Sequence, residues 1–165
     1  MEERIYYEEI RSSGTSALFA VMAVIFLALF AYRLTTIGWN FGSGLFLFLG
    51  VFFLFYFINY RTLKIVITNQ TLKLEFGLVG WTIALDNIRS CQEDDPPLWI
   101  KYGGAGVHFA MVGGEYRAFF NFLEYPRVKV TFQTKRGWVE ALSFSTRQPD
   151  RILELLGERS GNHGD

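Results

Sequence analysis

The sequence contains few of the residues that build reactive or metal-binding centres. Of its 165 residues, one is a cysteine and two are histidines. A single cysteine, Cys91, excludes an internal disulfide and any zinc cluster built from several cysteines. The two histidines, His108 and His163, supply too few partners for a catalytic triad or a metal pair. We therefore expect no catalytic residue, no metal and no cofactor, and we interpret Cys91 as a half-buried strand residue.

The sequence also lacks net charge. Its 16 basic residues balance its 16 acidic residues, and the isoelectric point is near 6.7. Without a basic surplus there is no global field to attract nucleic acid, so we expect no nucleic-acid partner. Glu93, Asp94 and Asp95 precede two prolines, a pattern typical of a solvated loop, and a cation site is the alternative interpretation.

Two stretches have no charged residue at all. Ala17 to Tyr32 and Leu45 to Ile58 are apolar runs separated by a short turn, Leu34 to Asn40. With its small polar flank, the first run reaches the ~20 residues that span ~30 Å of hydrocarbon. A soluble domain of this size has no room to bury two fully apolar helices. The acidic N-terminal residues are a poor secretory leader, so we expect an integral two-pass membrane protein with a transmembrane helical hairpin over residues 15–60.

Basic residues set the predicted orientation. The connecting turn has only Arg33, whereas four basic residues flank the two ends of the hairpin: Arg4, Arg11, Arg61 and Lys64. Basic residues stay on the cytoplasmic side, so we expect both termini and the following domain to be cytoplasmic. Aromatic rings at the ends of the runs favour headgroup level. The predicted membrane-surface contacts are Arg61, Lys64, Trp39 and Tyr60.

From Thr62 onward, apolar and polar residues alternate as they do in β-strands. The strands expected from this pattern cover residues 62–68, 71–76, 81–85, 88–92, 107–111, 115–120, 127–134 and 138–144. A short helix over residues 151–156, ended by Gly157, would plug an open barrel end with its apolar stripe. We expect residues 158–165 to form a flexible tail, and the polar residues 1–14 to form either an extra strand or an amphipathic collar on the membrane.

Three blocks of residues resemble a known family. They are Ile67 to Leu72 with Phe76-Gly77 and Ile83 to Ile88, then Tyr102 to His108, then Gly137 with Phe144 to Leu156. In order and spacing they resemble the bacterial PH-like domains that are fused to an N-terminal two-helix membrane hairpin. Ala105 and His108 stand where relatives tend to have Trp and Arg.

The resemblance implies an α+β membrane protein. A two-helix transmembrane hairpin would precede a PH-like antiparallel β-barrel or sandwich of about seven strands over residues 61–157, with one C-terminal capping helix. It also implies a membrane-attached scaffold of a kind that mostly has no assigned activity. Phosphoinositide binding does not carry over from the resemblance.

The glycine-rich stretch from Gly103 to Gly106 is the main candidate site. Such a stretch can cradle phosphate, but phosphate loops open a helix, whereas Val107 to Met111 has the pattern of a strand. We therefore predict a partner or ligand surface rather than a nucleotide site. Its residues are Trp99, Lys101, Tyr102, Gly103, Gly104, Gly106 and His108.

The expected function is that of a membrane-anchored, non-catalytic PH-like interaction or scaffold module. A sheet edge or the glycine-rich stretch would recruit a membrane-protein partner or another copy. One alternative is a lipid-headgroup binder, although the basic residues available for it are dispersed: Arg61, Lys64, Lys73 and Lys101. Another is a small enzyme or transport subunit, for which helices without a buried ionisable residue provide no polar lining.

Overall fold

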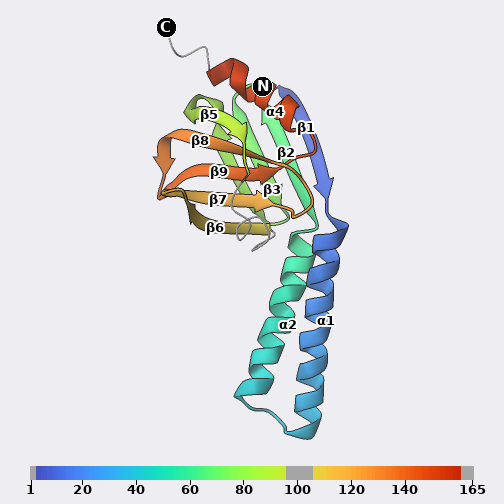
Figure 1. Ribbon diagram of the computed structural model, residues 1–165. Helices are drawn as coiled ribbons and strands as arrows, with labels where there is room; N and C mark the ends of the chain where they lie inside the picture. The colour runs from blue at the N-terminus through green and yellow to red at the C-terminus, as the bar shows by residue number, and fades with distance from the viewer. Residues whose placement is uncertain (1–2, 96–105, 161–165) are drawn as a thin grey trace. The chain divides into compact units, whose positions relative to one another are not determined.

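The computed structural model describes residues 3–95 and 106–160, and the chain divides into two compact units. One unit, Ser12–Arg61, is a hairpin of two helices. The other contains the strands and the C-terminal helix α4, and it includes the N-terminal strand as well as the chain from Thr62 onward (Figure 1). The hairpin is therefore an insertion within the β unit rather than a segment that precedes it.

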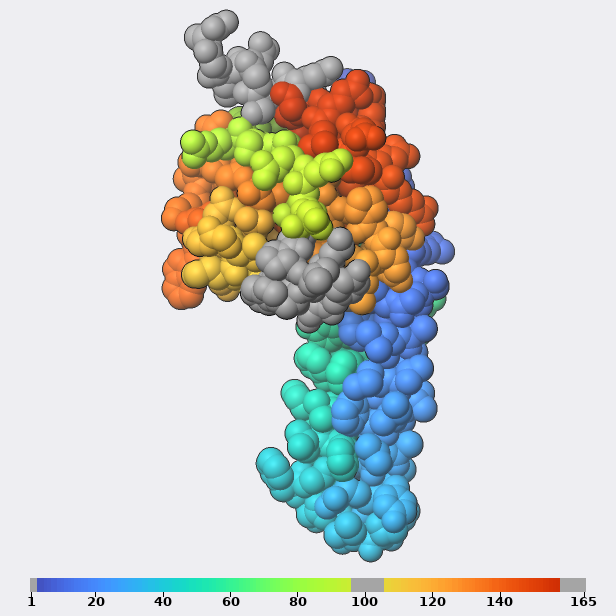
Figure 2. All heavy atoms as spheres, viewed as in Figure 1, coloured from blue at the N-terminus to red at the C-terminus, as the bar shows by residue number. Residues whose placement is uncertain are grey.

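The hairpin consists of α1 (Ser13–Thr36) and α2 (Phe41–Asn59). The Ser12 side chain accepts a hydrogen bond from the Thr15 amide at 2.9 Å, and the Asn40 side chain accepts one from the Ser43 amide at 3.1 Å. These N-caps satisfy amides that have no partner within the helix. Both helices are long and apolar enough to cross a membrane, and side chains project outward along them (Figure 2). The connecting turn is shorter than the predicted Leu34–Asn40, because α1 continues to Thr36.

A glycine brings the two helices together. Leu27 of α1 lies directly over Gly50 of α2, where a Cβ atom would be 2.7 Å from Leu27 Cδ2 and 3.3 Å from the Leu27 backbone nitrogen. Beside this contact, the rings of Phe26 and Phe53 stack with centroids 5.6 Å apart. Close approach at small residues is what allows helices to pack when no hydrophobic effect drives them together in lipid.

We expect Gly50→Val to destabilise the hairpin by about 1–3 kcal/mol, because the added atoms overlap Leu27 and force the helices apart. The matched control is Gly44→Val, since a Cβ at Gly44 would meet nothing within 4 Å. Unfolding of the full chain by SDS titration in mixed micelles measures both variants. Equal midpoints for the two variants would contradict the packing role of Gly50.

The first sheet has four strands in the order β1-β2-β3-β4. They are β1 (Arg4–Arg11), β2 (Thr62–Thr68), β3 (Thr71–Phe76) and β4 (Val79–Ala84), and each pairs antiparallel with its neighbour. Arg11 pairs with Thr62, so the strands on either side of the hairpin are joined by backbone hydrogen bonds. Of the two interpretations of the N-terminal segment, the extra strand is the one observed for residues 4–11.

The second sheet has five strands in the order β5-β8-β9-β7-β6 (Figure 1). After the short helix η1 (Leu85–Asn87), they are β5 (Ile88–Glu93), β6 (Gly106–Val112), β7 (Glu115–Asn121), β8 (Arg127–Arg136) and β9 (Val139–Ser145). Helix α4 (Pro149–Ser160) packs against β5 and β8. Cys91 lies half-buried on β5, and burial raises the pKa of its thiol to about 12.

The core lies between the two sheets. The alternation predicted for residues 62–76 is confirmed, because every second side chain of β2 and β3 is buried there. Phe76 of β3 contacts Phe120 and Phe122, with ring centroids 6.1 and 5.0 Å away, and all three rings are fully buried.

Of the expected antiparallel β-barrel or sandwich, the barrel is not observed among the described residues, and the purely antiparallel pairing needs correction. The described residues form two separate sheets that are not closed, with nine strands, and β7 pairs parallel with β9. The parallel pair arises because β9 inserts between β7 and β8 and runs antiparallel to β8. The final helix is also longer than predicted, since α4 continues beyond Gly157 to Ser160. The rest of the predicted tail, residues 161–165, lies outside the described residues.

Candidate functional site

The predicted partner surface is only partly within the described residues. Five of its residues lie outside them: Trp99, Lys101, Tyr102, Gly103 and Gly104. The other two, Gly106 and His108, lie on β6, and Gly106 begins the strand with a positive φ of 90°. The part of the candidate surface that can be examined is therefore strand β6.

Strand β6 is an edge strand. Among the residues that the structure describes, it pairs with β7 on one side and with no strand on the other. Its seven residues, Gly106 to Val112, contain no charged residue and no proline. Phe109 and Met111 are 48% and 64% exposed. An uncharged, regular edge with exposed apolar side chains can pair with another strand.

The other sheet edges carry features that hinder such pairing. Strand β1 has a register shift and four charged residues: Arg4, Glu8, Glu9 and Arg11. Helix α4 packs against β5, which also carries Arg89 and Glu93. At β4, the Arg136 guanidinium donates a hydrogen bond to the Thr82 carbonyl. Charges, bulges and covering elements protect edges in natural sheets, so β6 is the least protected of the four edges within residues 3–95 and 106–160.

Aromatic side chains extend the apolar surface of β6 toward the first sheet. Phe109 stacks on Tyr116 of β7 with ring centroids 6.2 Å apart, and it lies 6.3 Å from Trp81 of β4. The Arg136 guanidinium lies over the Trp81 ring at 5.3 Å. We call Trp81, Phe109, Met111 and Tyr116 the β6 patch. Phe109 and Met111 are exposed and Trp81 and Tyr116 are partly exposed. Apolar groups of this kind beside an edge that is unpaired among the described residues are typical of binding surfaces.

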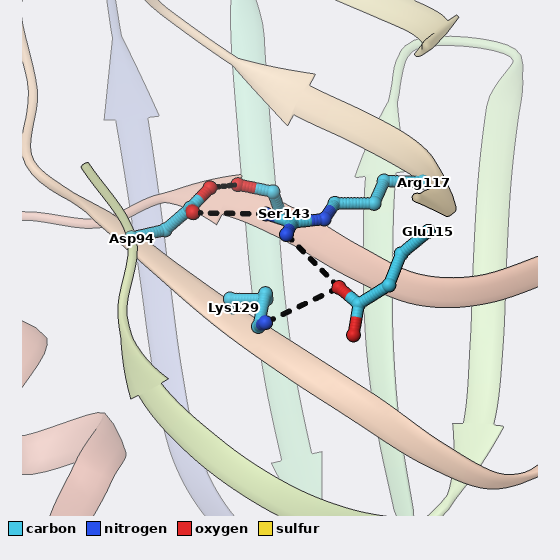
Figure 3. Close-up of polar contacts among 5 residues, drawn as sticks. All are labelled: Asp94, Glu115, Arg117, Lys129 and Ser143. Carbon is cyan, nitrogen blue, oxygen red and sulfur yellow. Dashed lines mark hydrogen bonds and ion pairs between the residues drawn. The ribbon is translucent and has the colours of Figure 1, made fainter. Parts of the chain in front are cut away.

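A buried network of charges lies on the second sheet (Figure 3). Arg117 of β7 contacts Asp94 Oδ1 at 3.3 Å and Glu115 Oε2 at 2.9 Å. Lys129 of β8 contacts the same Glu115 oxygen at 3.3 Å, and the Ser143 hydroxyl of β9 donates to Asp94 Oδ2. The side chains of Asp94 and Arg117 are only 6% and 10% exposed. The network therefore joins the end of β5 to three neighbouring strands.

This network was not predicted from the sequence. Lys129 alternates with core residues of β8 in the manner of a solvent-facing side chain, and Asp94 was interpreted as part of a solvated loop. For Asp94 the interpretation is wrong, because its side chain is only 6% exposed, whereas Glu93 and Asp95 are exposed. Lys129 is 9% exposed although it alternates with core residues. Arg117 lies opposite β9, which is distant from it in the sequence. No local sequence signal could therefore have revealed the network.

The serine, aspartate and histidine on this sheet do not form a catalytic triad. Ser143 hydrogen-bonds Asp94 directly, and Phe119 stands between Ser143 and His108 because it pairs with each of them across the sheet. Two strand spacings separate His108 from Ser143 by roughly 10 Å, well beyond a hydrogen bond. Over residues 3–95 and 106–160, no group of three His, Cys, Asp or Glu residues could hold a metal ion.

His108 lies on the same face of the second sheet as Ser143 of the network, because both align with Phe119 across neighbouring strands. Its ring is parallel to that of Phe119, with centroids 4.9 Å apart, and its buried Nδ1 has no hydrogen-bond partner among the described residues. Burial, and secondarily the charge of Arg127, lower the pKa of His108 below its ordinary 6.5. The imidazole is therefore neutral at neutral pH.

We expect His108 to make the protein less stable in mild acid. Because its pKa is lower in the folded chain, the unfolded chain takes up the extra proton, and stability falls as the pH drops below about 6.5. In His108→Phe, which keeps a ring on Phe119, this part of the pH dependence should disappear. Unfolding midpoints of both proteins at pH 8 and pH 5 provide the measurement. An unchanged difference between the two pH values would contradict the assignment.

The predicted membrane-surface residues do not form one site. Within the hairpin, Trp39 is 68% exposed in the connecting turn, whereas Tyr60 and Arg61 follow the far end of α2. The Arg61 guanidinium lies over the Phe57 ring at 5.3 Å, and Tyr60 packs on Tyr56 at 4.6 Å.

The basic residues of the first sheet lie beside carboxylates. Lys64 has Glu9 and Glu75 as its partners in the neighbouring strands, and Lys73 forms an ion pair with Glu75. Lys64 and Lys73 therefore lie among negative charges instead of forming a polybasic cluster.

Comparison with known proteins provides no identification. No family model matches the chain, and no curated protein matches it in sequence. Function must therefore be inferred from the chain's own residues.

Proposed function

We propose that the protein is a membrane-anchored, non-catalytic interaction module of the PH-like type. Its hairpin spans the membrane twice, and its β unit and both termini lie on the cytoplasmic side. Strand β6 and the β6 patch bind an extended segment of a protein partner. The observation that carries this proposal is that β6 has an uncharged edge, unpaired in the part of the chain that the structure describes, together with exposed apolar side chains.

Three features support the membrane anchor. The helices have 24 and 19 residues, which correspond to ~36 and ~29 Å at 1.5 Å per residue. The hairpin from Ser12 to Arg61 contains no acidic residue. Because Arg11 is paired with Thr62, the start of α1 and the end of α2 are held to one sheet and must leave the membrane on the same side. Basic residues at these ends favour the cytoplasmic side.

The PH-like assignment is supported by the order of the elements. Two sheets enclose a core of aromatic and aliphatic side chains, and a C-terminal helix packs against the second sheet. A scaffold of this kind presents binding surfaces at strand edges and loops without needing a reactive centre.

Orientation is tested by labelling single cysteines with a membrane-impermeant maleimide in intact cells, in a Cys91→Ser background. Ile37 is 61% exposed in the turn of the hairpin, and Gln92 is exposed on β5. We expect Ile37→Cys to react in intact cells and Gln92→Cys to react only after the cells are opened. The reverse pattern would overturn the cytoplasmic assignment.

Binding is tested by placing a photoreactive phenylalanine analogue at Phe109 of the full-length protein in its native membrane. The matched control is the same analogue at Leu78, which is 85% exposed in a turn of the first sheet. We expect a discrete protein adduct at Phe109 and none at Leu78. Adducts with lipid alone would favour a membrane-surface role, and equal labelling at both positions would overturn the proposed binding surface.

A further inference from the structure

We infer that the segment that pairs with β6 is β6 of a second copy of this chain, joined antiparallel about a two-fold axis at Phe109. This inference rests on the proposed function, because it names the partner of the same strand edge. The hydrogen bonds of the second sheet would then continue from one copy into the other, giving one sheet of ten strands from two sheets of five.

The side chains of β6 are compatible with such self-pairing. With Phe109 opposite its own copy, Val107 lies opposite Met111, and His108 lies opposite Ala110. All these pairs are uncharged, so no like charges are brought together. The same two-fold pairing at β1 would bring two copies of a strand with four charged residues against each other. Two of these residues are the adjacent glutamates Glu8 and Glu9. Self-pairing therefore fits β6 and is disfavoured at β1.

The neighbouring surface contributes additional contact area. A strand of seven residues is only ~24 Å long, which by itself is small against the ~1,200 Å² that a specific interface buries. Because the axis lies at Phe109, each copy also brings Met111 and Tyr116 to the interface, on the side where Trp81 contacts Phe109. Aromatic residues and methionine are enriched in the cores of interfaces.

Anchoring in a membrane favours association further. Two copies held in one bilayer meet at a higher effective concentration than two copies in solution, so a modest interface is sufficient. The chain has no net charge, and its copies therefore do not repel each other over long range.

The test is disulfide formation between single cysteines in full-length protein in proteoliposomes, in a Cys91→Ser background. We expect Phe109→Cys to form a dimer with itself, because paired strands place opposite Cα atoms ~4.5–5.5 Å apart. Val107→Cys should not form a dimer with itself, since its two copies would be four residues out of register, or ~13 Å. A mixture of Val107→Cys and Met111→Cys should form the mixed dimer.

Charge substitutions provide a second test that does not depend on disulfide formation. Phe109→Lys should abolish the dimer by placing two cations at the axis, and so should Phe109→Glu. A mixture of these two variants should restore a heterodimer, whereas variants that merely misfold would not recover on mixing.

The outcomes separate this inference from the proposed function. The predicted disulfide pattern supports self-pairing. A photoadduct at Phe109 with a different protein, together with a monomeric chain in proteoliposomes, overturns self-pairing and leaves the interaction module intact. Absence of both photoadducts and disulfide dimers overturns both. Equal disulfide yields at residues 107, 109 and 111 indicate random collision and also overturn the inference.

Discussion

Replacing Arg117 by methionine is expected to lower the free energy of unfolding by about 3–5 kcal/mol, because it leaves the buried Asp94 carboxylate without its cation. Arg117 is 8% exposed and contacts both Asp94 and Glu115. Methionine retains much of the aliphatic volume of arginine, so the loss of stability reflects the missing positive charge rather than a cavity. Urea unfolding of the full chain in detergent, followed by the signal of the β unit, is the measurement.

The control for this prediction is Arg151→Met. Arg151 forms an ion pair with Glu154 on α4, but both side chains are more than half exposed, and exposed pairs contribute little. In the double variant Arg117→Met/Asp94→Asn, stability should recover in part, because the uncompensated charge of Asp94 is removed as well. A loss at Arg117 no larger than that at Arg151 would contradict the structural role of the network.

The helices and the first strands are the parts of the fold that the sequence predicted well. Few structures keep an uninterrupted apolar run away from water, so such a run is easy to interpret. The period of two in residues 62–76 is likewise a local property of the chain. The hairpin turns are similarly local, since Gly113 and Gly114 both adopt the positive φ that the β6–β7 turn requires.

The spatial order of the strands could not be predicted in this way. The β7–β9 pair is parallel and joins segments separated by all of β8, so no turn between adjacent strands specifies it. Strand β1 pairs with β2, which follows the helical hairpin in the sequence. The short polar–apolar alternation of β1 gave no sign of that partner. Pairing between segments that are distant in sequence depends on how the whole sheet assembles, and a local sequence pattern does not specify that assembly.

The candidate site shows the same limit. The sequence drew attention to the glycine-rich stretch and His108, whereas the binding surface that we propose lies on the edge of β6. The charges of the network come from three different segments, namely β7, β8 and the residue that follows β5. A polar residue that alternates with core residues normally faces water. On β7 and β8 that expectation fails, because Arg117 and Lys129 are buried beside the carboxylates that neutralise them.

Substitution of Glu8 by alanine is expected to destabilise the β unit by about 2–4 kcal/mol, because three hydrogen bonds to one buried carboxylate are lost. Glu8 of β1 is 8% exposed. Its Oε2 accepts hydrogen bonds from the Tyr6 hydroxyl at 2.9 Å and the Thr146 hydroxyl at 2.6 Å, and its Oε1 accepts one from the Arg147 amide at 2.8 Å. Burial and the neighbouring Glu8 raise the pKa of Tyr6 well above its ordinary value, so the tyrosine remains a donor.

The adjacent Glu9→Ala is the matched control, since Glu9 lies on the same strand and makes only exposed contacts with Tyr7 and Arg11. Glu8 connects the first strand of the chain to the residues that lead into α4, and that helix packs against β5 and β8 of the other sheet. Loss of Glu8 should therefore speed hydrogen exchange in α4 as well as lower the unfolding midpoint, whereas loss of Glu9 should do neither. If exchange in α4 stays unchanged while the midpoint falls, the carboxylate stabilises β1 alone and does not hold the two ends of the β unit together.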